Sequence, residues 1–280
     1  MRNKFILFCV LLALTGIFGL AKNQVTVTYI ANDGYMFEAG TQKVVVDCMF
    51  YMEGSGHWHS PDKSVYEKMI KGEKPFDNIT AIIVTHNHGD HYSSDIVAKY
   101  LASFNTTLIA PPQVVASLKQ SRFFASGKST ILTAPADFYQ SGEFEVGQLK
   151  ITTLTLHHVG NNRGTQNMVA AIDFGGLTIL HAGDANLDDL YTAKFPPNDI
   201  VMLSYWQGFE IDVMEKINKN IKAKHVIFKH APYKTINESI QKIKDNYGKV
   251  SSHYSVFSFT FEGFEYYREG NQIKKEAVKD

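Results

Sequence analysis

A cluster of metal-binding residue types just after a short apolar run is the feature that most restricts how this chain can fold. His86, His88, Asp90 and His91 fall within six consecutive residues, after the run Ile79–Val84. A short run rich in β-branched residues is typical of a buried strand. Side chains two residues apart at an extended strand end project to the same side, so His86 and His88 can be directed at one point. The pattern therefore predicts a buried strand that ends at a metal site.

The two later members of the cluster are expected on the turn that follows this strand. Ser93 has the character of a helix start, and we predict a helix over Ser93–Ser103. Asp90 and His91 then lie between strand and helix, where they can be directed at a second, neighbouring point. Imidazole nitrogen and carboxylate oxygen suit zinc and similar first-row divalent ions. A histidine-rich surface turn is the alternative, but later strand ends supply further candidate ligands.

Two adjacent histidines end a later strand. Leu149–Leu156 is predicted as a strand, and His157 and His158 follow it directly. Adjacent residues on a strand point to opposite faces, so the two imidazoles cannot easily bind the same ion. We expect one of them to be a ligand, and the sequence leaves open which one.

Two more strand ends carry candidate ligands. The predicted strand Leu177–Leu180 leads into His181, Gly183 and Asp184. Glycine allows the chain to turn tightly and to bring Asp184 close to the centre, where its two oxygens could bridge two ions. We interpret His181 as a core or supporting residue rather than a ligand. His230 stands just past another predicted strand, at 224–228.

An aspartate and an irregular loop complete the set of candidates. Asp47 ends the apolar run Val44–Val46, where it could reach the site or merely begin a loop. The following loop, Phe50–Pro61, holds His57 and His59. It could be a substrate loop or a spare metal site, and we favour a surface loop near the mouth of the pocket.

The first residues have the pattern of an export signal. Arg2 and Lys4 make a positive start, Phe5–Leu20 is almost wholly apolar, and small residues precede the expected cleavage after Ala21. We predict a signal peptide over residues 1–21 and a secreted or periplasmic mature protein. An uncleaved anchor is the alternative, but the apolar run is short for a span of about 20 residues.

The composition excludes several partners. The formal net charge is +0, so no basic surface indicates nucleic acid. No later stretch is apolar enough to span a membrane, and we expect a small-molecule substrate, with the oligomeric state left open. Cys48 is the only cysteine left after cleavage, which rules out an internal disulfide. Strands and helices alternate without a linker, so we predict one domain over residues 22–280.

Other element predictions rest on weaker patterns. They are an antiparallel meander over Gln24–Asp47 at the edge of a sheet, a short strand at Phe138-Tyr139, an amphipathic helix over Phe209–Lys222, and a frayed polar tail over Asn271–Asp280.

The order of the strand-end motifs resembles a known family. Along the chain they read His-x-His-x-Asp-His, then His, then Gly-Asp, then His. This order resembles the metallo-β-lactamase superfamily over essentially the whole mature length. The resemblance implies an α+β fold, an αββα sandwich of two mixed sheets flanked by helices, with metal ions at one edge.

The resemblance also assigns roles to the candidate residues. It implies two divalent ions, zinc in the first place, with iron or manganese as alternatives. The implied sets are a first site of His86, His88 and either His157 or His158, a second site of Asp90, His91 and His230, a bridging Asp184, and Asp47 behind the histidines. In that position Asp47 would orient a ligand imidazole by accepting its other N–H.

The implied activity is hydrolysis. A hydroxide held by two metal ions would attack an ester, lactone, thioester or phosphodiester, and Asp90 would double as ligand and proton acceptor. Asp184 disfavours a true β-lactamase, since those members lack the bridging aspartate. A metal-binding protein of this fold without turnover is another alternative, and the absence of a Gly-x-Ser-x-Gly motif disfavours a serine hydrolase. Residues beside the motifs could shape the pocket: Arg163, Tyr205, Trp206 and Lys229.

Overall fold

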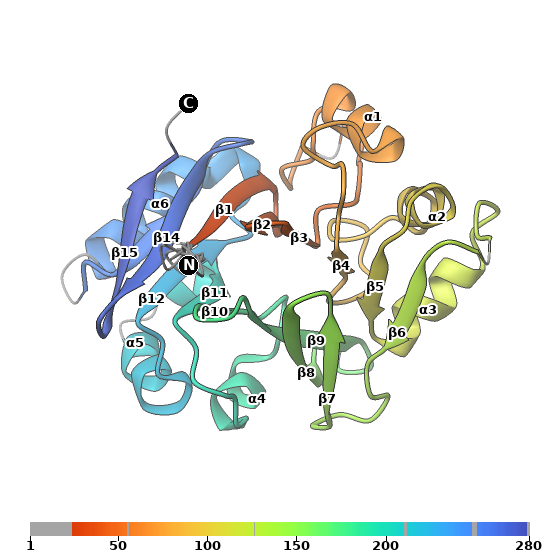
Figure 1. Cartoon of the computed structure of the whole chain (residues 1–280). Coiled ribbons are helices and arrows are strands. Elements are labelled where there is room, and N and C mark those ends of the chain that lie inside the picture. Colours follow the sequence, from red (N-terminus) through yellow and green to blue (C-terminus); the bar gives the residue numbers. More distant parts are fainter. Residues whose placement is uncertain (1–23, 55, 126, 210–211, 248–250, 279–280) are drawn as a thin grey trace, which may run out of the picture.

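Two β-sheets pack against each other, with helices on their outer sides (Figure 1). The computed structural model describes residues 24–278, apart from 55, 126, 210–211 and 248–250. The predicted signal peptide, at residues 1–21, lies outside the described residues. The αββα sandwich predicted for this chain is confirmed.

The first sheet has eight strands in the order β15-β14-β1-β2-β3-β4-β5-β6. Its pairs β3·β4, β4·β5 and β5·β6 are parallel and the others antiparallel, so the sheet is mixed. The bounds are β1 Gln24–Ala31, β2 Gly34–Ala39, β3 Gln42–Val46, β4 Ala81–Ile83, β5 Thr107–Ala110, β6 Thr130–Thr133, β14 Gly263–Glu269 and β15 Gln272–Ala277.

The second sheet has seven strands in the order β13-β12-β11-β10-β9-β8-β7. It is also mixed, since β10, β11, β12 and β13 pair in parallel and the pairs from β7 to β10 are antiparallel. The bounds are β7 Ser141–Val146, β8 Leu149–His157, β9 Gln166–Asp173, β10 Thr178–His181, β11 Ile200–Ser204, β12 His225–Lys229 and β13 Tyr254–Val256.

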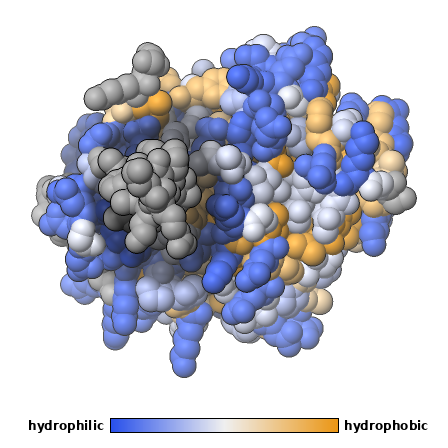
Figure 2. Space-filling model, in the orientation of Figure 1, coloured by the Kyte–Doolittle hydropathy of each residue, from blue (hydrophilic) through white to orange (hydrophobic). Residues whose placement is uncertain are grey.

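In the described part of the chain, each sheet carries helices on its outer face. Three helices cover the first sheet: α1 Lys63–Lys71, α2 Ser94–Ser103 and α3 Pro112–Lys119. The second sheet is covered by α4 Leu187–Thr192, the short α5 Val213–Lys216 with a π-helical turn Ile217–Ile221, and α6 Ile236–Tyr247. Two 3₁₀ turns, η1 Tyr205–Phe209 and η3 Tyr233–Thr235, follow β11 and precede α6. Figure 2 shows that the face seen in Figure 1 is hydrophilic over much of its area, with hydrophobic residues gathered mainly right of its centre.

The buried strands face a different core on each side. Val44 and Val46 pack between the two sheets, whereas Val45 packs against the helices over the first sheet. In the same way Ile83 faces the other sheet and Ile82 faces the helices. A strand covered on both faces must be apolar at every position. This explains the continuous apolar runs that precede Asp47 and the histidine motif.

Two predictions about the edges of the first sheet were wrong. The meander β1-β2-β3 is not at an edge, because β14 pairs antiparallel with β1 and places Val25 opposite Tyr266. The tail is not frayed over its length, because β15 forms the outermost strand beside β14. Its side chains are mostly exposed, with Ile273 buried, as suits an edge strand covered on one face.

Two further element predictions were wrong. Phe138-Tyr139 is a turn rather than a strand, and Tyr139 has a φ of 65°. Phe209–Lys222 is not one helix, because η1, α5 and the π-helical turn divide it. The apolar spacing still describes its packing, since Ile217 and Ile221 are buried against the second sheet. Among the described residues, no helix combines the length and apolar character needed to cross a membrane.

Candidate metal centre

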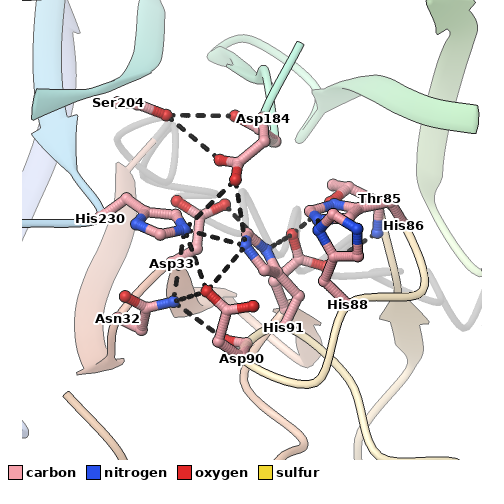
Figure 3. Close-up of polar contacts among 12 residues, drawn as sticks. Asn32, Asp33, Thr85, His86, His88, Asp90, His91, Asp184, Ser204 and His230 are labelled. Atoms are coloured by element: carbon pink, nitrogen blue, oxygen red, sulfur yellow. Dashed lines mark hydrogen bonds and ion pairs between the residues drawn. The ribbon is translucent and has the colours of Figure 1, made fainter. Parts of the chain in front are cut away.

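Strand ends from both sheets meet at one edge of the sandwich. The candidate residues of the first sheet follow β1, β3 and β4, which run in the same direction. Those of the second sheet follow β8, β10 and β12, which also share a direction. Residues far apart in the chain therefore converge on one cluster, shown in Figure 3.

The first group of side chains is made of three imidazoles. Nε2 of His86 and Nδ1 of His88 lie 3.1 Å apart, and the ring of His158 lies 4.8 Å from His86 and 4.5 Å from His88 between centroids. One nitrogen from each of the three lies within 4.8 Å of the others. Burial lowers the pKa of His86 and of His88, which keeps their rings neutral and able to bind a cation.

His158 is oriented for metal binding and His157 is not. Nδ1 of His158 donates to the carbonyl oxygen of Val159 at 2.8 Å, so its Nε2 carries the lone pair. That Nε2 is buried, has no hydrogen-bond partner and lies 3.6 Å from Oδ2 of Asp184. His157 points elsewhere: its Nδ1 donates to the carbonyl of Arg163 at 2.6 Å, and its ring stacks on Phe138. The structure thus brings His158 to the cluster.

A second group lies beside the first. Nε2 of His91 and Nε2 of His230 are 3.0 Å apart, and Oδ2 of Asp90 lies 3.7 Å from the former and 3.4 Å from the latter. These three residues also have ligand atoms within 4.8 Å of one another. Two imidazoles and a carboxylate directed at one point are a donor set that fits a first-row divalent cation.

Asp184 lies between the two groups. Its Oδ2 is 3.6 Å from Nε2 of His158, 3.5 Å from Nε2 of His91 and 3.3 Å from Nε2 of His230. Its other oxygen accepts a hydrogen bond from Ser204 Oγ at 3.3 Å. The carboxylate therefore reaches both groups from one position.

Gly183 is required for this placement of Asp184. Gly183 has a φ of 54°, and a Cβ there would lie 2.5 Å from Oδ1 of Asn167 and 2.8 Å from Thr85. Only glycine fits this turn without displacing its neighbours. Asn167 in turn accepts the backbone N–H of Asp184 at 2.8 Å.

Asp47 supports the second group from behind. Its Oδ2 accepts from Nδ1 of His91 at 3.0 Å, and its Oδ1 accepts the backbone N–H of Thr85 at 2.8 Å. The Thr85 hydroxyl also donates to Asp47 and lies 3.0 Å from Nδ1 of His86. A carboxylate behind a ligand imidazole fixes the ring and leaves the opposite nitrogen free for metal.

Two supporting residues, Asn32 and Asp33, were missed from the sequence. Asn32 donates to Oδ2 of Asp90 at 3.2 Å and to its backbone carbonyl at 3.0 Å. Asp33 lies 3.4 Å from Nδ1 of His91 and forms a buried ion pair with Lys229, whose Nζ also donates to the carbonyl of Gly183. Asn32-Asp33-Gly34 has the composition of an ordinary turn, so no local signal distinguishes these side chains.

The carboxylates and imidazoles of the second group carry opposite charges, which stabilise one another. Burial disfavours the ionised carboxylate of Asp90, but the hydrogen bond from His230 and the charge of His91 prevail and lower its pKa to about 2. Burial likewise disfavours protonation of His230, but Asp184 and Asp90 raise its pKa to about 9. The carboxylates thus attract positive charge into the group, which a divalent cation would also provide.

The remaining candidates lie around the cluster. His181 is buried, and its Nε2 lies 3.1 Å from the backbone oxygen of Asp33, as expected for a supporting residue. His59 hydrogen-bonds Tyr29, and neither it nor His57 belongs to a group of potential ligands in the described part of the chain.

The four residues suggested for the pocket lie in different surroundings. The Trp206 ring contacts that of His230 with centroids 5.5 Å apart, and Tyr205 packs on Trp206. Lys229 does not line a pocket, because its ammonium group is buried in the pair with Asp33. Arg163 is exposed on the loop after His158.

Two imidazole-rich groups that share one carboxylate, at the edge of an αββα sandwich, define a metal-site protein of the metallo-β-lactamase fold. A sequence model of the β-lactamase superfamily domain matches residues 42–231. This span covers more than half of the chain and all of the cluster except Asn32 and Asp33. The chain belongs to the β-lactamase superfamily.

Individual relatives agree with this assignment. A UPF0173 metal-dependent hydrolase of Pyrococcus furiosus is 26% identical over 202 residues, which are 65% of this chain and 80% of the relative. The metallo-β-lactamase fold protein YhfI of Bacillus subtilis superposes with a TM-score of 0.60 at 16% identity, over 87% of this chain and 100% of YhfI. Igni18, a metallo hydrolase of Ignicoccus hospitalis, superposes with a TM-score of 0.60 at 16% identity, over 88% of this chain and 100% of Igni18. At these identities the two structures show the shared fold.

The orientation of the adjacent histidines leads to a paired test. Loss of a residue that supports a metal ligand typically weakens metal binding about 10- to 100-fold. His158→Ala removes an imidazole of the first group itself, so it should weaken zinc binding by more than that. His157→Ala should leave zinc affinity within about threefold of the wild type, since its ring is directed at the Arg163 carbonyl. Competition with a chromophoric chelator measures both affinities. Equal losses in the two variants would contradict the orientation seen here.

Proposed function

We propose that this protein is a metal-dependent hydrolase that works with two divalent cations, zinc in the first place, on a small-molecule ester, lactone, thioester or phosphodiester. The placement of Asp184 between the two groups of ligands carries this proposal. His86, His88 and His158 would hold one cation, and Asp90, His91 and His230 the other. We further propose that the mature protein acts outside the cytoplasm, on the basis of its N-terminal sequence.

Cations bound here would supply Lewis acidity, which polarises a substrate oxygen and lowers the pKa of water. The chain itself provides a carboxylate in Asp90, which is ionised at neutral pH and would double as ligand and proton acceptor. Asp90 is also the more open carboxylate of the site, with 15% of its side chain exposed against 7% for Asp184. Asn32 would hold Asp90 in place through its two hydrogen bonds.

Metal removal provides the direct test of this proposal. The mature protein should contain about two zinc ions per chain and hydrolyse at least one member of a panel of lactones, esters, thioesters, phosphodiesters and β-lactams. Dialysis against a chelator should abolish the activity, and added zinc should restore it. Metal content is read by atomic emission and turnover by product formation.

The outcomes separate the proposal from its alternatives. Fewer than one metal ion per chain would exclude a two-metal site. Two ions without turnover of any substrate would indicate a binding protein that kept the fold. Activity confined to β-lactams would identify a β-lactamase, in spite of the bridging aspartate.

A further inference from the structure

Both tryptophans of this chain contact the same candidate ligand. The sequence contains only Trp58 and Trp206. The Trp58 ring meets that of His230 edge to face, with centroids 4.3 Å apart and planes at 90°. Trp206 meets it at 5.5 Å and 68°. The two indoles come from different parts of the fold, the loop after β3 and the 3₁₀ turn η1 after β11, and neither is fully buried.

The loop that carries Trp58 is tied down on both sides of it. Nδ1 of His59 is 3.1 Å from the Tyr29 hydroxyl, and its Nε2 is 3.4 Å from that of Thr260. The His59 ring stacks on Tyr233, whose backbone N–H donates to the carbonyl of His57 at 3.0 Å. Contacts on both neighbours of Trp58 therefore hold the indole beside His230.

A cavity lies on this loop. Its volume is about 260 Å³, and Trp58, His59 and Tyr233 are among its lining residues together with Met52. Ser60 and Asp62 line it as well, so the cavity combines aromatic and polar surface on the side of Trp58. Substrate pockets commonly combine such surface with a few polar groups at the reacting centre.

The turn that carries Trp206 is also held in place by its neighbours. Its 3₁₀ turn packs closely on α6 and β12, since a Cβ on Gly208 would lie 2.9 Å from side-chain atoms of both Ile243 and Phe228. Tyr205 packs edge to face on Trp206 with centroids 5.3 Å apart. The second indole is thus fixed by the second sheet, while the first is fixed by the loop.

We infer that Trp58 and Trp206 form an aromatic subsite beside the second cation group, which binds an apolar, preferably aromatic, part of the substrate next to the bond that is cleaved. Both indoles contact the His230 ring and still remain partly exposed, so part of their surface stays open to a ligand. Indole faces bind flat apolar groups through burial and favourable ring contacts. The inference rests on the proposed hydrolase function, of which it specifies the substrate class.

Two carboxylates test the subsite without turnover. Acetate and phenylacetate carry the same anionic group, and only phenylacetate has a ring. The wild type should bind phenylacetate at least about tenfold more tightly than acetate, as expected from burial of the ring. Because the chain has no other tryptophan, phenylacetate should also change the intrinsic tryptophan emission. Calorimetry gives the affinities, and fluorescence places the ligand.

Variants separate a subsite from a packing role. Trp58→Ala and Trp206→Ala should each reduce the phenylacetate preference to about threefold or less, and Trp→Phe at either position should keep most of it. Phe123→Ala serves as the control, since Phe123 is a partly buried aromatic that packs with the helices over the first sheet. It should keep the full preference.

The experiment is run on zinc-loaded and zinc-free protein in parallel. Equal affinity for the two carboxylates in both forms, or a preference that survives both alanine substitutions, would overturn the subsite. A tryptophan-dependent preference in either form supports it. The zinc content of the same samples reports separately on the proposed function, so the two can fail independently.

Discussion

Asp184→Ala is expected to abolish hydrolysis and to weaken zinc binding at both groups of ligands. Its carboxylate lies 3.6 Å from His158 in the first group and 3.5 and 3.3 Å from His91 and His230 in the second. Removing it also leaves His91 and His230 facing each other at 3.0 Å without the negative charge that raises the pKa of both. The loss of zinc affinity should exceed the about 10- to 100-fold caused by changes behind a ligand.

Stoichiometry and affinity in the same titration check this result. Zinc is titrated into chelator-treated protein, and hydrolysis is followed at each step. Asp212→Ala is the matched control, because Asp212 is an exposed carboxylate that pairs with Lys216 on the surface. It should behave as the wild type. An Asp184→Ala variant with two tightly bound ions and full activity would remove the bridging role from this residue.

Lys229→Met should be the most destabilising single substitution behind the site. Lys229 and Asp33 are fully buried and form an ion pair, and the same ammonium group donates to the carbonyl of Gly183. Removing the lysine leaves the Asp33 charge buried without its partner, which costs about 3–5 kcal/mol of the free energy of unfolding. For a chain of this size the melting temperature should fall on the order of 10 °C.

A double variant identifies the cause of this loss. Asp33→Leu together with Lys229→Met replaces both charges with apolar groups of similar size and should recover most of the lost stability. Lys274→Met is the control for an exposed pair, since Lys274 contacts Glu269 on the surface. It should cost about 1 kcal/mol or less. If Lys229→Met melts at the wild-type temperature, the buried pair does not contribute to stability.

The histidine motif could be recognised from the sequence because its geometry is local. His86, His88, Asp90 and His91 follow one buried strand within six residues, so the direction of that strand and the next turn already places them together. The apolar run before His86 predicted a buried strand, and the structure has β4 between the second sheet and the helices. The resemblance then supplied the αββα arrangement.

The pairing of distant strands in the first sheet could not be predicted from local sequence patterns. Nothing in the alternating pattern of β1 indicates that β14 pairs with it, since the two are more than two hundred residues apart. The polar tail was predicted to be frayed, because an edge strand covered on one face has few apolar residues. Pairing of this kind is decided by the whole sheet.

The choice between His157 and His158 was likewise made by the tertiary structure. Adjacent residues exchange faces when a strand shifts by one residue, so the choice depends on the register in which β8 ends. His157 is opposite Gln166 on β9, whereas His158 pairs with Ala185, the residue after Asp184. That last contact directs His158 toward the carboxylate of Asp184.

By itself, the sequence determined the candidate ligands, their positions at strand ends and the family that the chain resembles. Only the tertiary structure decided which neighbouring histidine joins the cluster, placed Asn32, Asp33 and Lys229 behind it, and set both tryptophans against His230. The physical reason is the range of the interactions. Strand periodicity and turns act over a few residues, while the supporting contacts join segments that only the closed sandwich brings together.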